Sequence, residues 1–171
     1  RVERWTDAIM ESPDAYTTPT VLHYPDKTEI VIAGGNYVTG HEPETGKEVW
    51  RGGGLNPKNS DRYRTIASPV AVDGMVYVPT RQRPLRAFRA GGTGDITESH
   101  LAWEWNKPRG PDVPTPVCDG KYFYMVDDRG TVTCLDAKTG EVVWGGERTA
   151  RGTVSASPLL ADGKLYIVNE D

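Results

Sequence analysis

Cysteine is scarce in this 171-residue sequence, which contains only Cys118 and Cys134. The two residues fall on the first and third of three consecutive predicted strands, so a whole strand separates them. Neighbouring strands lie about 4.8 Å apart, which places the two thiols about 9–10 Å from each other, beyond the reach of a disulfide bond. We therefore expect both cysteines to be small packing residues.

The sequence also lacks the features of several functional classes. No run approaches the roughly 18 apolar residues of a membrane span. The formal net charge is -4 at pH 7, whereas broad binding of nucleic acid requires a basic face. No segment repeats apolar residues at the helical period, and 19 glycines and 13 prolines are typical of a chain with many turns. The sequence therefore predicts an all-β protein with no membrane span and no nucleic-acid partner.

One ten-residue stretch occurs twice. Residues 41–50 (HEPETGKEVW) and 135–144 (LDAKTGEVVW) both read as the end of a strand, a turn and a second strand that closes on tryptophan. Asp or Glu caps backbone N–H groups in such a turn, and glycine takes the position with positive φ. The chain is therefore a repeat protein.

A second motif occurs four times, a little after each closing tryptophan. Three copies run into an Asp-Gly turn and then an apolar strand that carries tyrosine, the strongest short hairpin signal. The four copies begin Thr18-Pro19, Ser68-Pro69, Thr115-Pro116 and Ser157-Pro158, and the three turns are Asp73-Gly74, Asp119-Gly120 and Asp162-Gly163.

The cycle of Ser/Thr-Pro, Asp-Gly, Tyr and Asp-x-x-Thr-Gly-x-x-x-Trp resembles the repeat of the PQQ-binding-like β-propellers, the superfamily of quinoprotein alcohol dehydrogenases and BamB-like proteins. The resemblance implies four-stranded antiparallel blades of about 40–45 residues, of which about four fit this chain. We expect an open arc that is a fragment of a larger propeller. Its blades are predicted at about 15–51, 65–106 and 113–145, with the start of a fourth at about 153–171.

In the resembled family, a tryptophan on the outer strand docks between blades, and a flat ring with one N–H donor suits such a seam. Trp103 lies 13 residues before Pro116, close to the 14 that separate Trp144 from Pro158, so we expect Trp103 and not Trp105 to be the docking residue of the second blade. Both Trp50 and Trp144 are predicted to be buried. The full set of structural docking residues is Trp5, Trp50, Trp103, Trp144, Gly46 and Gly140.

Propeller geometry gathers certain loops at one end of the central channel. The candidate ligand-face residues in these loops are Arg81, Arg109, Asp112, Asp127, Arg129 and Glu170. Asp112, Asp127 and Glu170 could approach one another and offer oxygen ligands to Ca²⁺. The alternative is a solvated loop surface of mixed charge. The three histidines are isolated, without metal-ligand spacing or a nucleophilic partner.

Two functions follow from the resemblance. The first is a non-catalytic binding or scaffold module of the BamB-like kind, with no catalytic residue, metal or cofactor, whose partners are another protein or a second copy at the open propeller edges. The second is part of a PQQ- and Ca²⁺-dependent dehydrogenase that oxidises alcohols or sugars. The resemblance implies a periplasmic or other extracytoplasmic location for either function.

Overall fold

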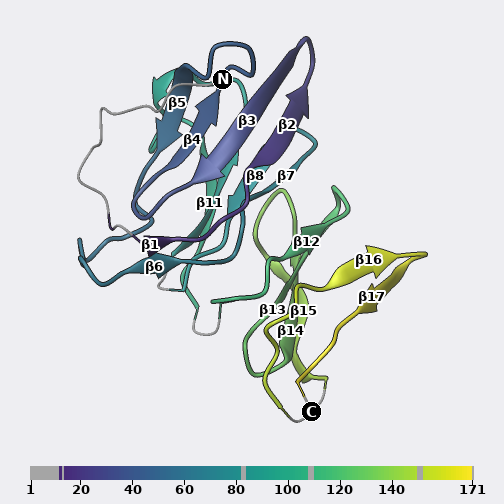
Figure 1. Cartoon of the computed structure of the whole chain (residues 1–171). Coiled ribbons are helices and arrows are strands. Elements are labelled where there is room, and N and C mark those ends of the chain that lie inside the picture. The colour runs from purple at the N-terminus through teal and green to yellow at the C-terminus, as the bar shows by residue number, and fades with distance from the viewer. Residues whose placement is uncertain (1–11, 13, 82–83, 108–109, 150–151, 171) are drawn as a thin grey trace.

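The structure is a computed structural model that describes residues 12, 14–81, 84–107, 110–149 and 152–170. These residues form strands and turns and contain no helix. Three large sheets and one hairpin follow one another in chain order (Figure 1). The fold is an open arc of β-propeller blades, as the repeats predict.

The first sheet, blade one, has five strands in the order β10-β5-β4-β3-β2. Four of them run consecutively along the chain: β2 (Thr20–Tyr24), β3 (Lys27–Ala33), β4 (Val38–His41) and β5 (Glu48–Gly52). The fifth, β10 (Gly94–Asp95), comes from the long insertion in blade two and pairs in parallel with β5 at Trp50 and Arg51. The glycines of residues 91–94 indicate a turn, but nothing in the sequence indicates that this turn extends the sheet of its neighbour.

Blades two and three each have four strands. Blade two contains β7 (Val70–Val72), β8 (Met75–Val78), β9 (Leu85–Arg89) and β11 (Leu101–Trp105). Blade three contains β12 (Val117–Cys118), β13 (Tyr122–Val126), β14 (Thr131–Asp136) and β15 (Val142–Arg148). Both cysteines are free thiols, as expected, and Cys134 is buried.

Blade four is a two-stranded hairpin of β16 (Leu159–Ala161) and β17 (Lys164–Tyr166). A separate parallel pair, β1 (Asp14–Ala15) and β6 (Arg64–Thr65), joins the segments that lead into blades one and two. The first strands of successive blades, β2, β7, β12 and β16, lie side by side.

The repeated Ser/Thr-Pro motif connects these inner strands. The Thr18 backbone N–H donates to Ser68 Oγ at 2.9 Å, the Ser68 N–H to Thr115 Oγ1 at 2.9 Å, and the Thr115 N–H to Ser157 Oγ at 3.0 Å. One hydroxyl and one N–H per blade therefore form a hydrogen-bonded chain across all four blades, which we call the hydroxyl ladder. This bonding is a physical reason for the repeat. Proline has no N–H, so the Ser or Thr before it supplies both the N–H and the hydroxyl of the ladder.

The seam between blades one and two is built around Trp50. Its side chain is 1% exposed and packs in one core with Val76, Val78 and Phe88 of blade two. The indole N–H donates to Glu29 at 2.6 Å, and Glu29 is itself buried in blade one. Gly40, the cross-strand neighbour of Trp50, leaves room for the ring, since a Cβ there would overlap it.

The seam between blades two and three is built around Trp103. Its indole N–H donates to the Ala137 carbonyl at 3.0 Å, and its ring lies on Gly140, where a Cβ would be 2.6 Å from Trp103 Cδ2. Tyr77 donates to the same carbonyl at 3.1 Å and stacks on Phe123 with ring centroids 4.8 Å apart. The Asp-x-x-Thr-Gly turn of blade three therefore receives the tryptophan of blade two.

The strand register relates the tryptophans to one another. Trp50 pairs with Gly40, Trp103 with Ala87, and Trp144 with Cys134. Trp105 instead pairs with Leu85, as Gly52 pairs with Val38. The register that Trp50 and Trp144 occupy is thus held by Trp103 in blade two.

Candidate functional site

The prediction that Trp144 is buried is wrong. Its side chain is 44% exposed, and every residue of β15 is exposed. The apolar residues Val142 and Val143 beside it are 43% and 49% exposed. The Trp144 ring lies beside the ring of Tyr124 on its own sheet, with ring centroids 6.3 Å apart. In the described residues, however, blade four lacks the turn that would receive the indole.

Tyr124 and Trp144 both pair with Cys134 and so lie on one face of the sheet, whereas Val142 pairs with Leu135, which is buried in the core shared with blade two. We call the exposed side of blade three around Tyr124 and Trp144 the Trp144 face.

The charged loop residues at the channel end are bonded within the protein. Asp112 is 9% exposed and lies between two guanidinium groups, with its Oδ2 2.9 Å from Arg64 Nη2 and 3.4 Å from Arg81 Nε. Asp112 Oδ1 is buried without a hydrogen-bond partner. The Asp112 main chain accepts from the Ala67 N–H at 3.3 Å, so this residue joins the connections on both sides of blade two.

The other acidic candidates each have their own hydrogen-bond partners. Asp127 Oδ1 accepts from the backbone N–H groups of Arg129 and Thr131 and closes a turn, while Glu170 pairs with Ser155. Asp128, beside them, accepts from the Val113 N–H at 3.1 Å, and burial, with Asp112 and Asp127 nearby, raises the pKa of its carboxyl. Within the described residues no three acidic, histidine or cysteine side chains form a metal-binding group. Asp112, Asp127 and Glu170 do not form such a group in the part of the chain that the structure describes.

The remaining predicted residues divide into two groups. Arg81 and Arg129 are exposed at the loop surface, and Gly46 and Gly140 both have positive φ in their turns. Trp5 and Arg109 lie outside the described residues.

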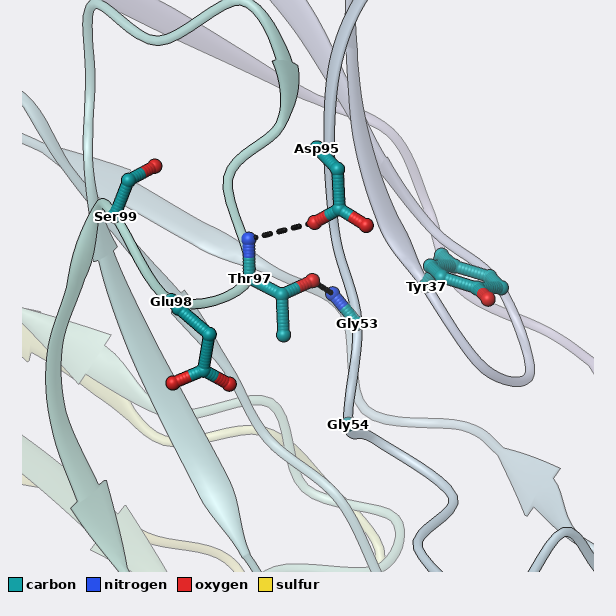
Figure 2. A pocket seen from close by; sticks show the side chains of 7 residues that line it. All are labelled: Tyr37, Gly53, Gly54, Asp95, Thr97, Glu98 and Ser99. Atoms are coloured by element: carbon teal, nitrogen blue, oxygen red, sulfur yellow. Dashed lines mark hydrogen bonds between the residues drawn. The ribbon is translucent and has the colours of Figure 1, made fainter.

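A pocket that the sequence did not predict lies between blade one and the blade-two insertion (Figure 2). Its volume is about 550 Å³, and Tyr37, Gly53, Asp95, Thr97 and Glu98 are among the residues that line it. Thr97 holds the two sides together, since its hydroxyl accepts from the Gly53 N–H at 2.8 Å and its N–H donates to Asp95 at 2.9 Å. The hydrogen bonds from Thr97 also lower the pKa of the Asp95 carboxyl.

Only the fold could have revealed this pocket. The insertion contains Gly91-Gly92-Thr93-Gly94, which predicts a turn, but nothing in these residues indicates that β10 pairs with β5. The Arg51 guanidinium lies over the ring of Tyr37, 5.5 Å from the ring centroid. The pocket is thus a polar junction between two blades.

The described residues define an open β-propeller arc with exposed apolar side chains on the outer strand of blade three. Comparison with known proteins agrees with this class. The family described as "Outer membrane protein assembly factor BamB" matches residues 97–171. The structure of BamB from Moraxella catarrhalis superposes with a TM-score of 0.53 at 19% identity, over 83% of this chain and 39% of that one.

Quinoproteins are also similar. The dehydrogenase subunit of a quinone-dependent alcohol dehydrogenase from Gluconobacter oxydans (strain 621H) is 27% identical over 60% of this chain and 15% of its own length. The structure of the quinohemoprotein alcohol dehydrogenase ADHIIG from Pseudomonas putida HK5 gives a TM-score of 0.56 at 17% identity, over 80% of this chain and 21% of that one. The chain thus spans well under half of each of these proteins. Its sequence and fold are thus similar to those of both BamB-like and quinoprotein alcohol dehydrogenase-like β-propellers.

No helix in the described part of the chain is both long and apolar enough to cross a bilayer.

Proposed function

We propose that this chain is a non-catalytic binding module of the extracytoplasmic space, which binds protein through the open ends of its propeller arc. The observation that carries the proposal is the Trp144 face. A large exposed indole on an edge strand that also carries two exposed valines is costly in water, and exposed apolar surface of this kind marks interaction sites. The BamB likeness supports the same function, since that family is described as an assembly factor.

The acidic residues of the channel end support a structural role. Calcium takes six to eight oxygen ligands, mostly from carboxylates and carbonyls that converge on it. Here the Asp112 carboxylate is neutralised by Arg64 and Arg81, and Asp127 Oδ1 accepts from two backbone N–H groups. The residues present do not fit the metal of a quinoprotein, so we derive no oxidation step through them.

The alternative function is a segment of a PQQ-dependent dehydrogenase. One observation favours it, the 27% identity to the quinone-dependent alcohol dehydrogenase subunit. Under this alternative the quinone would accept hydride from an alcohol or sugar.

The experiment that separates the two functions is a titration of the full-length protein with PQQ in the presence of Ca²⁺, followed by a dye-linked assay on alcohols and aldoses. A characterised quinoprotein dehydrogenase serves as the positive control. We expect no saturable quinone binding and no dye reduction above the protein-free rate. Quinone-dependent dye reduction would overturn the proposal and support the dehydrogenase.

A further inference from the structure

The pocket between blade one and the blade-two insertion carries uncompensated negative charge (Figure 2). Asp95 and Glu98 line it, and both residues are exposed. Neither carboxylate forms an ion pair in the part of the chain that the structure describes. Two ionised carboxylates repel an anion, and no group of three metal-binding side chains occurs among the described residues. The charge of the pocket therefore favours an organic cation.

The walls of the pocket already bind guanidinium groups of this chain. The Arg51 guanidinium lies over the Tyr37 ring, and Arg86 donates to the Gly53 carbonyl at 3.0 Å. Both Tyr37 and Gly53 line the pocket. An aromatic ring and a main-chain carbonyl that suit a guanidinium are therefore present in its walls.

Each of these arginines has a carboxylate partner of its own. Arg51 Nε lies 2.6 Å from Glu48 Oε1, and Arg86 pairs with Glu104. Neither glutamate is among the residues that line the pocket. The two carboxylates that do line it are thus left for a ligand.

The pocket has room for a long side chain. Its volume of about 550 Å³ lies within the range of about 300–1,000 Å³ that is typical of ligand sites. Glycine keeps one wall free of side chains, since a Cβ at Gly53 would lie 3.1 Å from both Thr97 Oγ1 and Tyr37 Cε1. Figure 2 shows Asp95 on the Tyr37 side of Thr97 and Glu98 on its other side. A ligand can therefore meet the ring and a carboxylate in the same part of the pocket.

From the charge and the walls of this pocket we infer that it binds an arginine side chain of a partner protein. The planar guanidinium stacks on the Tyr37 ring and pairs with Asp95, while Glu98 adds a second negative charge. Arginine suits the pocket better than lysine, because a guanidinium stacks on aromatic faces and its five N–H donors match carboxylate and carbonyl oxygens.

This contact is separate from the Trp144 face. The pocket lies between blades one and two, whereas the Trp144 face belongs to blade three. The inference rests on the proposed function, because it names a side chain by which a protein partner binds. It adds a second point of contact to the one proposed above.

Titration of the full-length protein with small probes tests the inference. The probe is Nα-acetyl-arginine N-methylamide, and the corresponding citrulline amide is its control, since citrulline has nearly the same shape without the charge. We expect the arginine probe to shift the amide NMR signals of Gly53, Thr97 and Glu98 saturably, with a Kd of about 1–10 mM. The corresponding lysine amide should bind about 2- to 5-fold more weakly, because it loses the stacking on the ring. The citrulline amide should not saturate these signals.

Variants that remove one charge each test the two carboxylates. Asp95→Asn keeps an oxygen that accepts from the Thr97 N–H, and it should raise the Kd of the arginine probe about 3- to 5-fold. Glu98→Gln should raise this Kd about 2-fold. Glu141→Gln is the matched control, because Glu141 is exposed in a turn of blade three and does not line the pocket, and its Kd should equal that of wild type. Circular dichroism melts establish that each variant is folded.

Equal shifts with the arginine and citrulline probes, or no saturation up to about 50 mM of the arginine probe, would overturn the inference. An equal loss of affinity in all three variants would overturn it as well, because the probe would then respond only to net charge. Failure of the arginine probe leaves the Trp144 face and the proposed function in place. Quinone-dependent dye reduction refutes the proposed function whatever the probe binds.

Discussion

Trp103 and Trp144 occupy the same register in consecutive blades, yet one is 7% exposed and the other 44%. The residues around them correspond as well, because Tyr77 and Ala87 in blade two match Tyr124 and Cys134 in blade three. The difference lies in the next blade along the chain. Blade three offers Trp103 the Ala137 carbonyl and Gly140, whereas the described hairpin of blade four has no corresponding turn.

This comparison shows that a tryptophan seam is a property of two blades. At the Trp103 seam the outer strand of blade two supplies the ring, and the turn of blade three supplies the acceptor and the glycine surface. Without the turn of the next blade, the same tryptophan side chain is exposed apolar surface, which favours association. Paired variants, one at the closed seam and one at the open side, test this division of roles.

The largest expected effect is that of Trp103→Ala. Removal of a buried aromatic ring costs about 3–5 kcal/mol, because it loses the transfer free energy and leaves a cavity. Trp144→Ala, its counterpart on the open side, should cost less than about 1 kcal/mol in dilute protein, since its ring is partly solvated already. Urea unfolding followed by circular dichroism measures both free energies. Equal losses for the two variants would contradict the idea that the seam needs both blades.

The glycine side of the seam gives the next largest effect. Gly140 and Gly74 both have φ of 73°, so alanine at either position should cost about 1–2 kcal/mol for the left-handed backbone. Only Gly140 touches Trp103, whereas nothing lies within 4 Å of a Cβ at Gly74. Overpacking should therefore add another ~1–3 kcal/mol to Gly140→Ala. If the two variants lose the same stability in urea, the ring contact makes no contribution.

The tyrosines beside the two tryptophans give a smaller difference. Tyr77→Phe removes the hydrogen bond to Ala137, which should cost about 0.5–1.5 kcal/mol, toward the low end because Trp103 still donates to that carbonyl. Tyr124 bonds weakly to exposed Asp119 at 3.4 Å, and Tyr124→Phe should change stability by less than about 0.5 kcal/mol. Thermal melts of the two variants provide the measurement, and a greater loss in Tyr124→Phe would reverse the argument.

Much of the fold could be predicted from the sequence because it depends on turns and spacings set by neighbouring residues. The Asp-Gly turns appear as expected, with both Asp73 and Gly74 at positive φ, and the spacing from Trp103 to Pro116 leads to the register that the sheet adopts. Such features depend on residues near one another in the chain.

The predictions that failed concern features that depend on residues far apart in the sequence. The exposure of Trp144 is decided by the absence of a receiving turn in blade four of the described structure, which cannot be read from residues 135–144 themselves. Likewise, Asp112 resembles a candidate metal ligand until Arg64, 48 positions earlier, is placed beside it. The hydroxyl ladder was visible only as four Ser/Thr-Pro motifs, because a sequence does not show which hydroxyl a backbone N–H will reach.

The smallest expected effect concerns Asp128. This residue bonds to the segment that leads into blade three and to the segment that leads into blade four. Its carboxylate accepts from Val113 before blade three, and its carbonyl accepts from Val154 before blade four at 3.0 Å. Burial raises the pKa of this carboxyl above its ordinary value of 3.8, so the native state holds the proton more tightly than the unfolded state. The resulting stability is present below about pH 3.8 and is lost as the pH rises through the raised pKa.

Asp128→Asn should remove that loss, because the amide oxygen can still accept from Val113 and carries no charge. We expect its melting temperature to exceed that of wild type by a small margin at pH 7, and the margin to shrink as the pH falls to about 3.5. Asp61→Asn, at an exposed position, controls for the change in net charge. Melts across this pH range provide the measurement. A variant that is less stable than wild type at pH 7, with a deficit that disappears in acid, would show that the folded protein stabilises the ionised carboxylate, and that Val113 outweighs burial at this junction.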